Sequence, residues 1–418
     1  MNTTAKPHRT SRRTSAVIGL ALAGVLAAGA GSYGIARASA ADFPLVHSET
    51  MPPDATAGVA IAAPATALTF ARADLGAGPT VLVVTDYRDG TITGVDLSAA
   101  TSRAFEDPVT AFDALGYAAI EAVAADTSLP RTTVAATDVL TSLNTHEHHV
   151  GTGTNYREHQ AEATIDEPFL FPKVASITDS HGELATDDRE LLDYEVELGI
   201  VALEDITAAT GTPEHVGLVL SNDWTDRELL VSQIEPDDLT GGAGFTNAKS
   251  QPGFLTTGDL FVIPADWQSY YRDLQLDLYV NGDLRQRADP SQLVWDAPTM
   301  IAKTLAAGER TWDSDGEPTT LTAEPGVITR GTILQTGTPE GVVYRAPDTR
   351  QRFLGFMEWA GTLGTNADSI VDSALQVYVR DAHAAGVYLQ PGDEVVTRAE
   401  GLGQIVTTIV AGERASTE

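Results

Sequence analysis

The chain has 418 residues, 43% of them hydrophobic, so it is long enough for two or three domains around a sizeable core. Its formal net charge of −32 makes nucleic acid and anionic membranes poor partners, and we expect neither. It has no cysteine, which excludes disulfides, thiolate catalysis and cysteine-ligated metals.

The first 40 residues have the order of a secretory signal peptide. Basic residues including Arg12 and Arg13 precede an apolar, Ala/Gly-rich run from Ala16 to Ala30, and Ala38-Ser39-Ala40 supplies small side chains for cleavage. We therefore expect export to the cell envelope or the medium, with no stable membrane insertion after cleavage and a mature N-terminus at Ala41 that mass spectrometry would detect. The arginine pair resembles the twin-arginine type, with the general export pathway and an uncleaved anchor as alternatives.

Short strands and turns follow, which predict a small N-terminal α+β domain over residues 41–145. The β-branched run Val81–Val84 indicates a strand that ends in a polar turn at 86–90, and Ile92–Leu97 is its expected hairpin partner. Residues 111–124 are predicted to be helical. No residue of this region suggests chemistry.

Residues 146–412 are predicted to form a second, mostly β domain that carries the catalytic site. Strands are expected at 194–203, 274–280, 331–336 and 394–399, and Asn281-Gly282 is a strong hairpin turn signal. A late helix is expected at 366–384.

Glu195 and Glu197 are the first candidates for chemistry. Residues two apart on a strand point to the same face, and two adjacent carboxylates repel each other unless a cation lies between them. The end of an apolar strand offers Asp223 as a third acid, and oxygen ligands suit Mg²⁺, Mn²⁺ or Ca²⁺. A solvated strand face is the alternative, but the apolar flanks of the pair favour burial and therefore a metal site.

Three further segments carry suitable polar groups. His159 and Glu162 lie three apart, so on a helical turn they share a face and form a general-base pair, or else an ordinary surface pair. Lys249 is either an anion contact or a solvated charge. The Gly-containing turn at 336–338 exposes amides and hydroxyls that suit a carboxylate, or it is only a structural turn.

Taken together and in this order, these segments resemble the fumarylacetoacetate hydrolase family. The resemblance covers most of residues 150–342 and 391–410 and implies a mixed β-sandwich roll of that family's C-terminal type, commonly a homodimer. The matching stretches are Thr154-Asn155-Tyr156-Arg157-Glu158-His159 with Glu162, Phe171-Pro172-Lys173, Asp193–Leu198, Asn222-Asp223 with Arg227, Lys249-Ser250, Val280-Asn281-Gly282 with Gln286, Thr336–Val342 and Pro391-Gly392-Asp393.

The resemblance also implies a role for each matching residue. One divalent cation, Mg²⁺ or Mn²⁺ with Ca²⁺ as the alternative, would be held by three acids: Glu195, Glu197 and Asp223. His159, Glu162 and Lys249 would be catalytic. The substrate would be contacted by Lys173, Arg227 and the turn of Thr336, Gly337 and Thr338.

The implied activity is hydrolysis of a carbon–carbon bond in a small anionic 2-oxo acid or 1,3-diketone, similar to an acylpyruvate or fumarylacetoacetate. A metal-held enolate and a His-activated water would carry the reaction. An isomerase or decarboxylase on the same metal site is the first alternative, and an exported binding protein without chemistry is the second. One departure from the family is an insertion at about 344–389.

Overall fold

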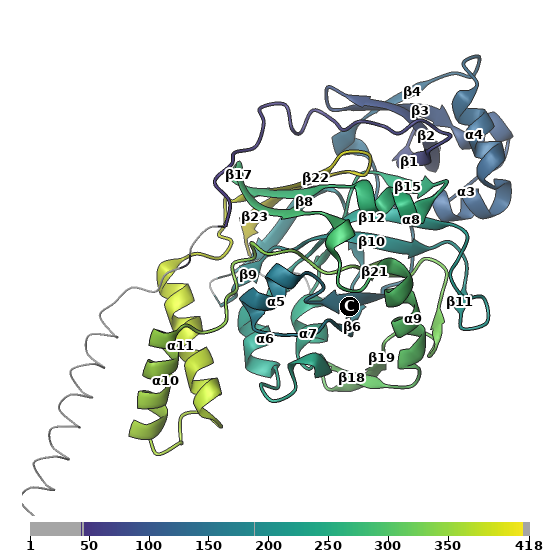
Figure 1. Cartoon of the computed structure of the whole chain (residues 1–418). Coiled ribbons are helices and arrows are strands. Elements are labelled where there is room, and N and C mark those ends of the chain that lie inside the picture. The colour runs from purple at the N-terminus through teal and green to yellow at the C-terminus, as the bar shows by residue number, and fades with distance from the viewer. Residues whose placement is uncertain (1–42, 44–45, 188, 413–418) are drawn as a thin grey trace, which may run out of the picture. The chain divides into compact units, whose positions relative to one another are not determined.

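The computed structural model describes residues 43, 46–187 and 189–412, so the predicted signal peptide lies outside the described residues (Figure 1). By contacts between residues, residues 43–346 and 386–412 form one compact unit, and residues 347–385 form another. The predicted α+β, mostly β class with mixed sheets is confirmed. Within the described ranges, none of the helices combines the length and apolarity needed to cross a membrane.

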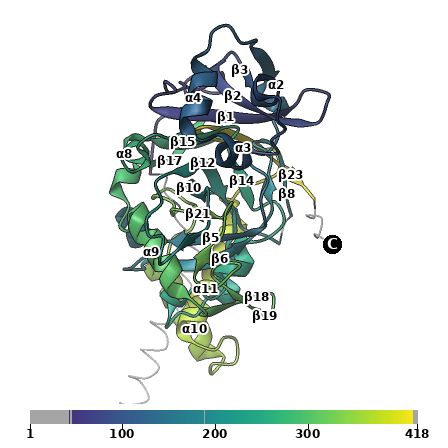
Figure 2. The same cartoon turned by 90° about the vertical axis from the view of Figure 1, so that its right-hand side faces the viewer.

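The larger unit is built on one 12-stranded sheet with the order β4-β3-β2-β1-β15-β12-β10-β21-β5-β6. Off this path, β14 pairs with β12, and β7 pairs with β14. Its strands are β1 (Ala67–Asp74), β2 (Pro79–Arg88), β3 (Thr91–Asp96), β4 (Thr132–Ala135), β5 (His148–Gly153), β6 (Phe169–Val174), β7 (Ile177–Thr178), β10 (Val196–Ala202), β12 (Val216–Asp223), β14 (Leu255–Thr257), β15 (Phe261–Pro264) and β21 (Ile333–Gln335). Figure 2 shows β10 and β12 near the middle of this unit and β1 to β3 at one end of it.

The N-terminal strands continue this sheet. β1 pairs antiparallel with β15, with Leu68 opposite Ile263, so residues on both sides of position 145 share one set of hydrogen bonds. The sheet thus runs across position 145, and the domain boundary expected there stays a prediction.

Two local expectations for the N-terminal region were wrong in detail. The helix expected at 111–124 is two helices, because Gly116 between them has a φ of +74° that ends the first one. β2 runs on through Arg88, since its turn needs only Asp89 and Gly90, both at positive φ.

A second sheet has the order β17-β16-β22-β23-β8. The predicted hairpin turn at Asn281-Gly282 is confirmed, with φ of +53° and +83° between β16 and β17. The strands are β8 (His181–Thr186), β16 (Leu276–Val280), β17 (Asp283–Ala288), β22 (Glu394–Ala399) and β23 (Gly403–Ala411).

Short strand pairs and helices complete the larger unit. The pairs are β9 (Leu192–Asp193) with β13 (Thr225–Asp226), β11 (Ile206–Thr207) with β20 (Val327–Ile328), and β18 (Thr311–Ser314) with β19 (Glu317–Thr320). The helices are α2 (Leu97–Thr101), α3 (Pro108–Leu115), α4 (Tyr117–Ala125), α5 (Arg157–Ala163), α6 (Arg227–Gln233), α7 (Phe245–Lys249), α8 (Trp267–Tyr270) and α9 (Ala297–Ala307).

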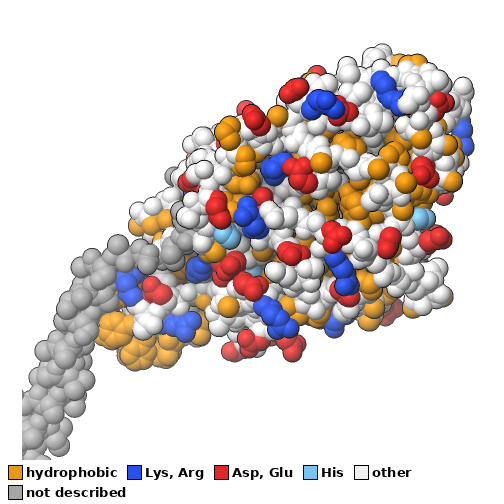
Figure 3. All heavy atoms as spheres, turned by 45° about the horizontal axis from the view of Figure 1, so that its top comes forward, with side chains coloured by type: hydrophobic (Ala, Val, Ile, Leu, Met, Phe, Trp, Pro, Cys, Tyr) orange, Lys and Arg blue, Asp and Glu red, His pale blue; other side chains and the backbone are white. Residues whose placement is uncertain are grey.

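β10 and β12 lie at the centre of the core. Every residue of both strands is buried, which is why their sequences are almost continuously apolar rather than alternating. The polar residues that interrupt them therefore need partners inside the protein. By contrast, acidic and basic side chains are interspersed over the face shown in Figure 3.

The smaller unit is a helical hairpin of α10 (Thr349–Gly361) and α11 (Ile370–Ala385). It falls within the predicted insertion, and α11 overlaps the helix expected at 366–384. Asp348 and Gln351 form a capping box at the start of α10, and Gly355 lets this helix approach Ala374 closely, because a Cβ at Gly355 would lie 2.5 Å from the Ala374 nitrogen.

A buried carboxylate joins segments far apart in the chain. Asp259 is fully buried and accepts hydrogen bonds from the Tyr87 hydroxyl (2.6 Å) and the Gln404 N–H (2.9 Å). Burial raises the pKa of Asp259 to about 7, although both hydrogen bonds oppose that change. The folded protein therefore binds a proton here that the unfolded chain has already released.

This proton makes part of the stability depend on pH. Between about pH 4 and 7 the folded state holds the extra proton, so the contribution of Asp259 to the unfolding free energy falls as pH rises, by about 1.4 kcal/mol per pH unit. In Asp259→Asn this contribution is expected to disappear. Urea unfolding of both proteins at pH 5, 6, 7 and 8 measures the difference. A constant difference across the series would contradict the prediction.

Candidate active site

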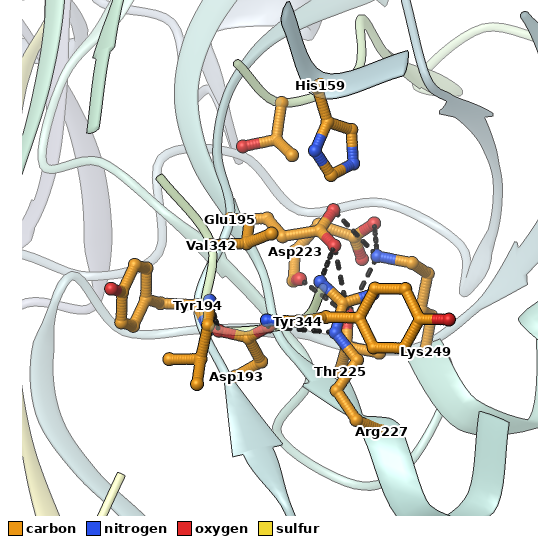
Figure 4. Close-up of polar contacts among 12 residues, drawn as sticks. His159, Asp193, Tyr194, Glu195, Asp223, Thr225, Arg227, Lys249, Val342 and Tyr344 are labelled. Atoms are coloured by element: carbon orange, nitrogen blue, oxygen red, sulfur yellow. Dashed lines mark hydrogen bonds and ion pairs between the residues drawn. The ribbon is translucent and has the colours of Figure 1, made fainter. Parts of the chain in front are cut away.

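Three acids meet where β10 begins and β12 ends. Antiparallel pairing sets Val196 opposite Asn222, and this places Glu195 and Glu197 beside Asp223. Asn222 fixes the junction because its side-chain oxygen accepts the Glu195 N–H at 2.9 Å. Carboxylate oxygens of the three acids all lie within 4.8 Å of one another, and all three residues are buried. Figure 4 shows two of them, Glu195 and Asp223, side by side.

Three basic side chains surround these acids. Lys249 Nζ, at the end of α7, lies 2.7 Å from Glu195 and 2.9 Å from Asp223. Lys173 on β6 contacts the other oxygen of Asp223 and donates to the Phe254 carbonyl at 2.7 Å. Arg227, the first residue of α6, lies 2.5 Å from Glu195.

Arg227 is held from a second side by Asp193, a residue to which the sequence assigned no role. Its Nε donates to Asp193 at 2.8 Å, and Asp193 also accepts the N–H groups of Val343 and Tyr344. The Tyr344 ring lies 5.5 Å from the guanidinium, within the range of a cation–π contact. Arg227 and Lys173 thus contact protein carboxylates in this structure, and their roles in binding substrate stay predictions.

The charges of the three acids are unequally balanced. Burial would raise the pKa of Glu195, but Lys249 and Arg227 lower it to about 2. Burial and the nearby Asp223 and Glu195 carboxylates raise the pKa of Glu197 well above its usual range. Burial would lower the pKa of Lys249, yet Asp223 and Glu195 raise it, so Lys249 is charged.

This donor set fits a divalent cation. It offers three buried carboxylates from two adjacent strands, and Glu197 accepts a hydrogen bond from the Gly337 N–H at 2.9 Å but pairs with no Lys or Arg among the described residues. Hard oxygen donors, one of which has no basic partner, suit Mg²⁺ or Mn²⁺. Glu195, Glu197 and Asp223 are therefore the residues that would hold the ion.

His159 and Glu162 form the expected pair on α5. His159 Nδ1 lies 3.0 Å from Glu162 Oε2, and both side chains are largely buried. Glu162 is held in turn by the Gly341 N–H at 3.0 Å and by Arg345 at 2.9 Å. Figure 4 shows the His159 ring facing the carboxylates of Glu195 and Asp223. A tautomer with its proton on Nδ1 would donate to Glu162 and leave Nε2 as the nitrogen that can act as a base.

The turn at 336–338 differs from its expected use. Gly337 donates its N–H to Glu197, and the Thr338 hydroxyl donates to the Val196 carbonyl at 3.0 Å and accepts from Gln286 at 2.8 Å. The Thr336 hydroxyl is buried and, within the described ranges, has no hydrogen-bond partner. Two of the three groups are thus already bonded within the protein, and the roles of all three residues in binding substrate stay predictions.

Sequence reasoning gave no role to Arg345 or Gln286. Gln286 joins β17 to the metal-site strand by accepting the Val196 N–H at 2.9 Å. Arg345 lies three residues after the Thr336–Val342 motif, and this proximity in the sequence was the only indication that it belongs to the site. Both act through pairings between residues far apart in the chain, which spacing alone does not reveal.

The chain is similar to several known proteins. The chain is 24% identical over 271 residues to the 4-hydroxyphenylacetate degradation bifunctional isomerase/decarboxylase of Escherichia coli, covering 63% of this chain and 47% of that one. It is 31% identical over 201 residues to the oxaloacetate tautomerase YisK of Bacillus subtilis, covering 46% and 58%. The chain thus spans about half the length of these curated relatives.

A solved structure supports the fold. The maleylpyruvate hydrolase of Sphingobium sp. SYK-6, in complex with manganese (II) ion and pyruvate, aligns with a TM-score of 0.50 and 20% identity over 83% of this chain and 100% of that one. The family description "Fumarylacetoacetate (FAA) hydrolase C-terminal" matches residues 148–410, which is more than half of the chain and includes the three acids, the His159–Glu162 pair and Lys249. The chain belongs to the fumarylacetoacetate hydrolase family.

Proposed function

We propose that this protein is a metal-dependent enzyme that hydrolyses a carbon–carbon bond in a small 2-oxo acid or 1,3-diketone. The observation that carries the proposal is the His159–Glu162 pair facing three buried carboxylates, with Lys249 among them. An ion held by the three carboxylates supplies, when bound, Lewis-acid stabilisation of the enolate that bond cleavage leaves.

The residues of the chain would supply proton transfer and charge stabilisation. His159 takes a proton from the attacking water, and Glu162 keeps the ring oriented and stabilises its positive charge. Lys249 is charged and also contacts Thr225 at 2.7 Å, and its positive charge would stabilise the oxyanion that the attack forms. The Thr336 hydroxyl donates to the substrate carboxylate.

A second candidate is isomerisation, tautomerisation or decarboxylation of an oxo acid at the same site. It is supported by the printed activities of the curated relatives, an isomerase/decarboxylase and an oxaloacetate tautomerase. In isomerisation or tautomerisation the same His159 would move a proton between two atoms of the substrate. In decarboxylation CO₂ would leave and His159 would deliver a proton to the enolate carbon, and in none of these reactions is a bond hydrolysed. Both candidates share acid–base chemistry next to a carbonyl group and a small anionic substrate.

One panel separates the two candidates. Purified protein with Mg²⁺ or Mn²⁺ is incubated with acetylpyruvate and with oxaloacetate, and products are followed by NMR, with EDTA-treated protein as the control. Hydrolysis yields acetate and pyruvate from acetylpyruvate only when metal is present. Keto–enol exchange or decarboxylation of oxaloacetate without hydrolysis would favour the second candidate. No turnover of either compound would contradict both candidates for these substrates and favour a binding protein.

A homodimer and export from the cell also stay proposals, which light scattering and analysis of the culture medium would test.

A further inference from the structure

A cavity of about 330 Å³ lies outside the metal site, and two of its lining residues, Gly341 and Arg345, contact Glu162. It is formed where Gly341–Arg345, Arg285 on β17 and residues 386–390 come together. None of the three acids, and neither His159 nor Lys249, lines it. Its volume is at the lower end of the range for ligand pockets, which suits a small molecule.

The walls of this cavity carry aliphatic and aromatic side chains, and its charged groups are mainly basic. Val46, Val280 and Leu389 contribute apolar surface, and two arginines, Arg285 and Arg345, contribute charge. Both guanidinium charges oppose the burial that raises the pKa of Tyr194, so both lie near the Tyr194 hydroxyl. In a chain of net charge −32, two cations at one small cavity mark a place for an anion.

Arg285 has an N–H group that is available for a further hydrogen bond. Its Nε is buried and has no hydrogen-bond partner among residues 43, 46–187 and 189–412. Its ion pair with Asp283 is long, at 3.8 Å, and the Arg285 side chain is 19% exposed. A buried donor without an acceptor is costly, and a carboxylate in the cavity would remove that cost.

The acid that lines the cavity is already engaged. Asp393 accepts the Asn281 side-chain N–H at 2.8 Å and the Gln390 N–H at 2.7 Å, so it closes a turn rather than neutralising the arginines. Arg345 donates to the carbonyl oxygens of Val342 and Tyr344 and to Glu162, which leaves part of its five-donor guanidinium for a ligand.

We propose that this cavity binds a small aliphatic monocarboxylate, with its carboxylate on Arg285 and Arg345 and its chain against the aliphatic walls. Because Arg345 also holds Glu162, a bound carboxylate would compete with Glu162 for that guanidinium and lower turnover. This coupling rests on the proposed function, whereas the binding itself does not.

Butyrate is the probe, and its binding to the full protein is measured by calorimetry without turnover. Arg285→Gln is expected to weaken butyrate binding at least tenfold, since it removes a hydrogen bond between charged groups. Arg287→Gln, which removes the same charge on the same strand but outside the cavity, should leave the affinity within twofold. Glu197→Gln should also leave it within twofold, because that residue lies in the metal site.

Val46→Trp provides an independent test that does not require replacing an arginine. Val46 is 41% exposed and lines the cavity, so a larger side chain there should fill the space without disturbing the core, and butyrate binding should be lost. Butyrate that does not bind wild-type protein, or binds both cavity variants as wild type, would overturn the proposal. Loss of binding in Glu197→Gln would place butyrate in the metal site and overturn it as well. An inactive enzyme that still binds butyrate would contradict only the proposed function.

Discussion

Replacing His159 by alanine is expected to lower turnover roughly 10²–10⁴-fold, the usual contribution of a positioned acid–base group. The three acids and Lys249 remain in place, and they contact the ground state as well, so substrate affinity should change much less. Steady-state and single-turnover kinetics separate the two effects. His181→Ala, which removes a half-buried histidine on β8 outside the site, is the matched control and should keep full activity.

A substitution of Glu162, which contacts His159, tests the same prediction further. Glu162→Gln should lose less than His159→Ala, because it removes orientation and charge support but not the base. The double variant should be little worse than His159→Ala alone, since the two residues are in contact and act as one unit. Full activity in both single variants would show that the pair has no catalytic role and would favour a reaction that needs the metal only.

Glu197→Gln is expected to abolish activity and to lower the bound metal well below one ion per chain, while the fold survives. The amide oxygen of Gln can still accept the Gly337 N–H, but it cannot supply the negative charge that a divalent cation needs from its ligands. Metal content is measured by mass spectrometry of the desalted protein, and folding by circular dichroism. Glu183→Gln, on the exposed side of β8, is the control. A Glu197→Gln protein with full metal content and normal turnover would rule out the assignment.

The parts of the site that the sequence predicted depend on local geometry. Glu195 and Glu197 share a face because they are two apart at the start of a strand, and His159 reaches Glu162 because they are three apart on a helical turn. The turn at Asn281-Gly282 follows from its two residues alone. In each case a short stretch of chain contains all the physical information that is needed.

The parts of the site that the sequence did not predict depend on contacts between residues far apart in the chain. Arg345 meets Glu162, and Asp193 meets Arg227, only after strands far apart in the chain have assembled. The groups of the 336–338 turn are occupied by Glu197, Val196 and Gln286 for the same reason. Gly116 divides a helix that periodicity alone predicts as continuous, because its conformation at positive φ is a property of the folded chain.

The buried Asp259 has a practical consequence for dissecting this protein. Its two hydrogen-bond donors are Tyr87 on β2 and Gln404 on β23. The carboxyl group therefore has both donors only when these two strands and the segment of Asp259 itself are all present. A fragment trimmed to the family match at 148–410 would lose Tyr87 and would leave β15 with an open edge where β1 had paired. Such a fragment would retain every residue of the candidate metal site and yet tend to aggregate, so the minimal folding unit is larger than the catalytic region.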